Sequence, residues 1–134
     1  MRTTKIIVDI LMTIFVILSF VRWEESNFLF HAVVGTACTL LFGVHIFLHR
    51  KWLKATTKSV LTGKLNKKLT GKYVVNILLL AIWGVAIVTG FLAVGWVAFA
   101  RLHAVTSRVG LVLIVVHVFQ HIPQIKSYMG MKKF

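Results

Sequence analysis

Four long apolar runs, separated by polar or basic stretches, dominate the sequence. The runs cover about residues 6–22, 28–49, 73–98 and 102–122. A helix rises about 1.5 Å per residue, so the second run would measure about 33 Å, enough to cross a hydrocarbon core of about 30 Å. We therefore predict an all-α fold, a four-helix transmembrane bundle in a single domain that occupies residues 1–134.

The segments between the runs predict where these helices begin and end. Residues 24–27 form a polar turn, and residues 53–72 form a basic connector whose apolar helical face is interrupted by Gly63. Arg101 marks the turn before the fourth run, and Pro123 is expected to end the last helix. The first run is long for the apolar region of a signal peptide and lacks a small-residue cleavage site, so we expect it to be retained.

Composition supports a membrane protein. The chain is 58 % hydrophobic and only 14 % charged, whereas a soluble domain carries about 25 % charged residues. The net charge of +13 comes from bases clustered between the apolar runs, a pattern typical of topology signals and lipid-headgroup contacts rather than of nucleic-acid binding. The single cysteine, Cys38, excludes an intrachain disulfide and a cysteine-based zinc or iron–sulfur site.

The distribution of Lys and Arg predicts the orientation. Thirteen of them lie in the N-terminus, in residues 50–72 and in the C-terminal tail, whereas Arg22 and Arg101 fall on the opposite side of the membrane. By the positive-inside rule both termini and the connector are cytoplasmic. The second and fourth helices then run in the same direction.

All six histidines lie in two copies of one segment, residues 31–49 and 103–121, in which eight of nineteen positions are identical. This repeat predicts an internal duplication of a two-helix unit. The same interval of 72 residues separates the members of each matched pair: His31 and His103, His45 and His117, His49 and His121.

Helical geometry puts the histidines of each copy on one stripe. A helix turns about 100° per residue, so His45 lies about 40° short of four turns from His31, and His49 completes about five turns. In parallel helices the two stripes can face each other, with histidines of equal depth in pairs. Because ionisable side chains inside a membrane are costly, they normally mark function.

Opposed imidazole pairs suit the axial positions of a haem iron. Fourteen residues separate two levels by about 21 Å, which leaves room for one haem at each level, whereas levels four residues apart differ by only about 6 Å. We therefore predict two haems. The axial ligands are His31 with His103 for the outer haem and, for the inner haem, His45 with His117, which we favour, or His49 with His121.

Other residues of the apolar runs have two interpretations each. Arg108 is a counter-charge for a haem propionate or a residue that snorkels to the interface. Gly35 lets a flat macrocycle approach the backbone or serves ordinary helix packing, and the same applies to Gly43, Gly84, Gly90, Gly95 and Gly110. Asp9 is a near-interface residue helped by the helix N-terminus, or part of a proton path at a quinol site.

The histidine spacing resembles a known pattern. Two histidines fourteen apart on each of two parallel helices are similar to the core four-helix module of cytochromes b. The longer pattern His31-x3-Gly35-x9-His45-x3-His49-x2-Trp52 resembles the flavinylation-associated cytochromes of bacteria. The second copy departs from it, with Ser107 in place of Gly35 and Pro123 close behind His121.

This resemblance implies b-type haems in a bacterial cytoplasmic membrane and electron transfer from a quinol to an extracytoplasmic flavin or other redox protein. It implies His31, His45, His103 and His117 as ligands, with His49 and His121 as the alternative inner pair. A dimer, or membership of a larger quinol-linked oxidoreductase, is compatible with this interpretation. The alternatives are a histidine-based transition-metal transporter or sensor, and a non-redox membrane anchor subunit.

Overall fold

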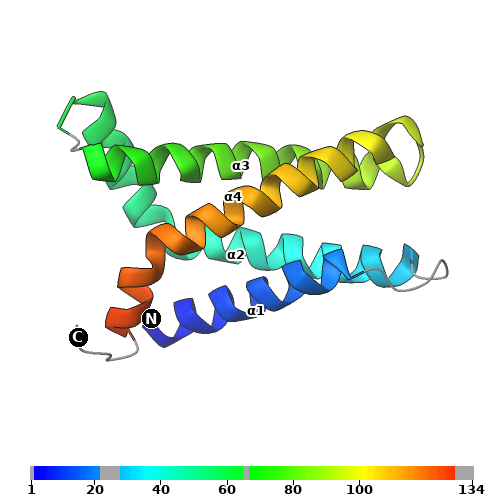
Figure 1. Ribbon diagram of the computed structural model, residues 1–134, viewed down its shortest axis with the longest axis horizontal. Helices are drawn as coiled ribbons and strands as arrows, with labels where there is room; N and C mark the ends of the chain where they lie inside the picture. The colour runs from blue at the N-terminus through cyan, green and yellow to red at the C-terminus, as the bar shows by residue number, and fades with distance from the viewer. Residues whose placement is uncertain (1, 22–27, 65–66, 129–134) are drawn as a thin grey trace. The chain divides into compact units, whose positions relative to one another are not determined.

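The computed structural model describes residues 2–21, 28–64 and 67–128, and these residues form four helices without a strand. The helices are α1 (Arg2–Phe20), α2 (Phe28–Leu61), α3 (Lys67–Ala93) and α4 (Ala98–Tyr128) (Figure 1). Each is long and apolar enough to cross a membrane. The all-α prediction is confirmed, and the chain has the build of a multi-pass membrane protein. The expected turn at residues 24–27 and the end of the first run at Arg22 lie outside the described residues.

Apolar side chains cover the outer surfaces of the helices. Leu40 is 69 % exposed and Phe119 is 67 % exposed, whereas few side chains, such as Val16 and Cys38, are buried. In water such a surface would be unfavourable, because burying apolar area drives folding and association. Lipid tails are as apolar as these side chains, so a membrane removes the penalty.

The predicted connector 53–72 is largely helical. Helix α2 continues to Leu61, and the backbone then closes in a Schellman motif: the Gly63 amide donates to the Val60 carbonyl, and the Lys64 amide donates to the Ser59 carbonyl. Gly63 has a φ of 65°, which only glycine adopts without a steric penalty. The helical face expected for the connector is thus present up to Leu61, where Lys, Ala and Leu residues of good helical propensity continue α2 beyond its apolar run, and Gly63 ends the helix.

The boundaries of the last two helices also differ from the sequence prediction. Helix α3 ends at Ala93 rather than near residue 98, so Gly95 lies in the turn, where its amide donates to the Leu92 carbonyl. Arg101 lies within the first turn of α4 and not in a loop.

Pro123 lies inside α4, so the expected stop at this residue was wrong. A proline removes one amide donor and bends a helix, but its fixed φ is compatible with helical geometry. In Figure 1 α4 changes direction toward its C-terminal end.

The chain divides into two compact units, Met1–Thr56 and Thr57–Phe134. The first contains α1 and most of α2, and its buried side chains include Val8, Val16, Val34 and Cys38. The second contains the end of α2 with α3 and α4, and its buried side chains include Trp83, Ala86, Thr89 and Thr106. Each unit therefore contains one pair of consecutive long helices, as the predicted duplication requires. Below, the pair α1–α2 is called the first hairpin and the pair α3–α4 the second hairpin.

Candidate metal or cofactor site

His31 lies at the start of α2 and is held by α1. Its Nδ1 atom is 3.1 Å from the backbone oxygen of Ser19. A carbonyl oxygen can only accept, so Nδ1 carries the proton and donates this bond. In the neutral ring the lone pair then resides on Nε2, the nitrogen that a metal would take.

His103 has the same arrangement in the second hairpin. Its Nδ1 donates to the backbone oxygen of Ala86 in α3 at 2.8 Å. The ring also packs against Gly90, where an added Cβ would lie 3.0 Å from both Cε1 and Nδ1 of His103. Gly90 thus gives the imidazole the space it needs to reach its carbonyl partner.

His45 and His117 use side-chain acceptors instead. The Nδ1 atom of His45 donates to Oδ1 of Asp9 at 2.7 Å, and Nδ1 of His117 donates to Oδ1 of Asn76 at 2.7 Å. The His45 side chain is 19 % exposed and that of Asp9 is 47 % exposed. Both imidazoles are therefore oriented by an oxygen on the preceding helix, as His31 and His103 are.

The four hydrogen bonds are equivalent in the two hairpins. In the first hairpin the sequence separation between histidine and acceptor is 12 residues for the outer bond and 36 for the inner bond. In the second hairpin the corresponding separations are 17 and 41 residues. Both separations are five residues longer in the second hairpin than in the first. The register between the two helices of a hairpin is therefore the same in both, and the five extra residues lie between the acceptor segment and the histidine segment. The duplication predicted from α2 and α4 therefore extends to α1 and α3.

The third histidine of each copy lies against the second. The ring centroids of His45 and His49 are 4.6 Å apart with 35° between the planes, and those of His117 and His121 are 4.6 Å apart with 38°. His121 also donates from Nδ1 to Oε1 of Gln124 in α4. Each hairpin thus places two imidazoles side by side at its inner level, so both inner pairs stay candidates.

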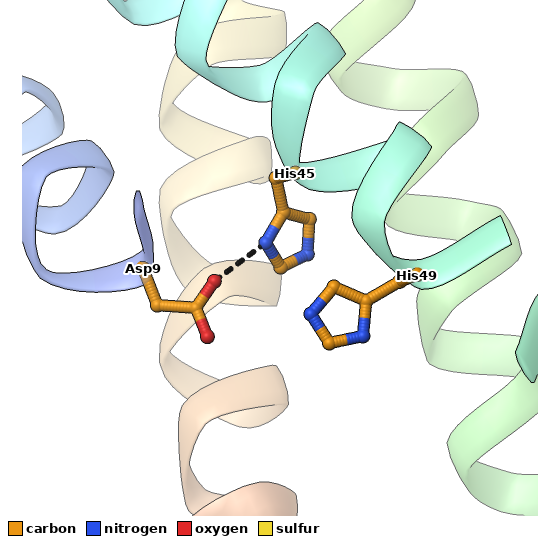
Figure 2. Close-up of side chains that lie close together, drawn as sticks. All are labelled: Asp9, His45 and His49. Carbon is orange, nitrogen blue, oxygen red and sulfur yellow. Dashed lines mark hydrogen bonds and ion pairs between the residues drawn. The ribbon is translucent and has the colours of Figure 1, made fainter. Parts of the chain in front are cut away.

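Asp9 completes a cluster in the first hairpin. Figure 2 shows the Asp9 carboxylate and the imidazoles of His45 and His49 pointing toward one another. Ligand atoms of these three residues all lie within 4.8 Å of one another, a spacing that could hold a metal ion. Their donor set, imidazole and carboxylate, suits zinc and other divalent transition metals.

Asp9 and Asn76 make contacts with histidines that the sequence analysis did not predict. Asp9 contacts His45 directly, a role more specific than a place near the interface, and Asn76 was not identified. The signal was present, because Asp9 and Asn76 are the single side-chain carboxylate and amide in their apolar runs. An isolated polar group in a membrane helix needs a partner, and histidine is a suitable one.

The remaining candidates fall into two groups. Gly35 and Gly84 have open space where a Cβ would stand, whereas a Cβ at Gly110 would lie 2.8 Å from Trp83 and one at Gly90 would lie 3.0 Å from His103. For Gly90 and Gly110 the structure thus shows close packing between helices. Arg108 is exposed on α4, and its contact with a haem propionate stays a prediction, as does the contact of Gly35.

No family model, no curated protein and no solved structure matches the chain. The functional conclusion therefore depends on the geometry of the two hairpins.

Proposed function

We propose that the chain is a dihaem membrane cytochrome that transfers electrons across a membrane. The observation that carries this proposal is the repeated hydrogen bond from Nδ1 of four histidines to an oxygen of the preceding helix. Metal-bound histidines almost always donate their other ring N–H to a carboxylate, a backbone carbonyl or water, which fixes the tautomer and the ring orientation.

The residues of each hairpin fit a haem. Each supplies one imidazole near its turn and a second one fourteen residues further along the helix, about 21 Å away. By the equivalence of the hairpins, His31 with His103 would hold the outer haem, and His45 with His117 would hold the inner haem. His49 with His121 is the other inner pair, because their rings lie beside the favoured ligands.

Bound haem iron would supply one-electron chemistry by cycling between the ferric and ferrous states. The chain's part is to hold four imidazoles in one tautomer and to bring two levels of cofactor into the apolar span. The open positions at Gly35 and Gly84 favour the approach of a flat macrocycle. Arg108 would compensate the charge of an outer propionate.

We further propose a bacterial cytoplasmic membrane as the location, with both termini cytoplasmic. A quinol is then the electron donor, and an extracytoplasmic flavin protein or other redox protein is the acceptor. The resemblance of the histidine spacing to the flavinylation-associated cytochromes supports this direction, and the basic residues at the cytoplasmic side suit anionic lipid headgroups.

A second candidate function is binding of a divalent transition metal, as in a transporter or sensor. The cluster of Asp9, His45 and His49 favours it. However, the second hairpin has Asn76 in place of Asp9, and a neutral amide is a weaker ligand for such a metal than a carboxylate. The amide oxygen of Asn76 accepts the hydrogen bond of an imidazole N–H as the Asp9 carboxylate does. The feature that both hairpins share is therefore an oriented histidine and not a set of metal ligands.

The test is a reduced-minus-oxidised visible spectrum of the purified protein, with haem, zinc, copper and nickel measured per chain. We expect a low-spin b-type spectrum and about two haems per chain. His31→Ala should remove the outer haem, whereas Thr36→Val, which removes a hydroxyl bonded to Ala32 in its own helix, should retain both. Absence of haem after expression with adequate haem supply would refute the proposal, and stoichiometric metal would then favour the second candidate.

A further inference from the structure

The four oxygens that accept from the histidines differ in charge. Ser19 and Ala86 offer backbone carbonyls, and Asn76 offers an amide oxygen. The fourth acceptor is the Asp9 carboxylate, which is paired with His45. The otherwise equivalent hairpins therefore differ at one acceptor, and this difference lies at the inner level.

We propose that Asp9 lowers the reduction potential of the haem bound by His45, so that the haem bound by His31 and His103 is reduced first. This inference rests on the proposed dihaem function. It assigns Asp9 the part of a positioning residue, which acts on the iron through the imidazole that it holds.

Two effects of the carboxylate act in the same direction. A strong acceptor on Nδ1–H gives the imidazole more negative character, which makes Nε2 a more basic ligand. A negative charge close to the iron also favours the ferric state, which carries one more positive charge than the ferrous state. The neutral acceptors of His31 and His103 exert neither effect to the same degree.

The position of Asp9 and His45 keeps the effect of the carboxylate charge on the haem from being screened by water. The His45 side chain is 19 % exposed, and it lies in an apolar helix where charges are screened less than in water. Lys5 lies one turn before Asp9 in α1, and the Asp9 carboxylate accepts the hydrogen bond from Nδ1 of His45 at 2.7 Å. The carboxylate is thus directed at the histidine.

The two hairpins provide matched variants for the test. Asp9→Asn gives the first hairpin the acceptor that the second already uses at the same geometry, so the hydrogen bond and the fold should be retained. Asn76→Asp introduces the carboxylate in the second hairpin. The double exchange keeps a single carboxylate and moves it from the ligand His45 to the ligand His117.

Redox titrations of the purified proteins, followed by visible absorbance at one pH, separate the outcomes. Asp9→Asn should raise the lower of the two potentials so that the reduced-to-oxidised ratio of that haem increases about tenfold at a given potential, about 59 mV for one electron. The higher potential should stay in place. Asn76→Asp should decrease the reduction potential of the same haem, the one with the lower potential. The double exchange should return that potential close to its value in the unaltered protein.

The results that would overturn the inference are distinct from those that would overturn the function. If the unaltered protein binds two haems but Asp9→Asn shifts neither potential, shifts both equally or shifts the higher one, Asp9 does not set the order of reduction. If the two single variants move different haems, His45 and His117 do not share an iron. If the unaltered protein binds no haem, the proposed function fails and the inference fails with it.

Discussion

Replacement of Gly90 by alanine tests whether close helix packing positions His103. The added Cβ would lie 3.0 Å from two atoms of the imidazole, whereas ordinary contacts begin at 3.4 Å. The ring must therefore retreat by about 0.4 Å, which would lengthen its 2.8 Å hydrogen bond to the Ala86 carbonyl to about 3.2 Å, the upper end of the usual range. We expect the bond to weaken without breaking.

The effect on stability is a balance of two terms. Alanine in a helix interior is favoured over glycine by about 1 kcal/mol, and forcing an extra carbon into a packed site costs about 1–3 kcal/mol. The expected net loss for Gly90→Ala is thus about 0–2 kcal/mol. Gly71 is the matched control, because it lies in the same helix, is exposed and has open space at its Cβ position, so Gly71→Ala should gain about 1 kcal/mol.

Two measurements on the purified proteins check this prediction. Reversible unfolding in detergent should separate the two variants by about 1–3 kcal/mol, the overpacking term. The haem content of Gly90→Ala should fall from about two toward one, with the haem of the His45 level retained and Gly71→Ala unchanged. Equal stability and equal haem content of the two variants would show that the contact between Gly90 and the imidazole is not required.

Three further changes have defined outcomes. Gly110→Ala would place a Cβ 2.8 Å from the buried Trp83 ring, so we expect a loss of about 1–3 kcal/mol in detergent unfolding, and unchanged stability would contradict the close packing of α3 and α4. Gly63→Ala forces a side chain into a positive φ, which costs about 1–2 kcal/mol, measurable as a lower unfolding midpoint. His45→Ala should remove the inner haem from the visible spectrum while His49→Ala retains it, and the opposite result would assign the inner iron to His49.

The membrane helices could be predicted from the sequence because a single physical quantity, apolar length, decides whether a helix crosses a bilayer. Their ends could not. Residues 53–61 continue α2 beyond its apolar run, and no hydrophobic pattern distinguishes a polar helix from a polar loop. Gly63 indicated an interruption of the helix, but from the sequence alone a glycine is compatible both with a weak point inside a helix and with a helix end.

The histidines were visible in the sequence because both copies keep the same residue at the same spacing. The partners of the histidines were not identified from the sequence, for two reasons. Ser19 and Ala86 contribute backbone oxygens, which every residue possesses, so no residue type marks the position. Asp9 and Asn76 lie in a short matching segment, Val-Asp-Ile-Leu at 8–11 and Val-Asn-Ile-Leu at 75–78, but it recurs after 67 residues rather than after the 72 of the histidine repeat, so an alignment on the histidines does not bring the two residues together.

The register of the hairpins explains why the inner acceptors are side chains while the outer ones are backbone carbonyls. The outer and inner histidines of a hairpin are fourteen residues apart. The two acceptors on the preceding, antiparallel helix are only ten residues apart, Ser19 and Asp9 in the first hairpin and Ala86 and Asn76 in the second. Four residues correspond to about 6 Å along a helix, so at the inner level the acceptor residue lags one turn behind its histidine.

Side-chain direction closes this gap. Helical side chains lean toward the N-terminus of their own helix. In an antiparallel hairpin the side chain of Asp9 therefore extends toward the level of His45, and the imidazole leans back toward Asp9. A residue at this position needs an oxygen two bonds beyond Cβ, which Asp and Asn both have, whereas Ala has none and the Ser hydroxyl is one bond shorter. The two hairpins can therefore differ in charge at this position while keeping the same geometry, and this freedom allows one duplicated unit to hold two imidazoles alike and to tune them differently.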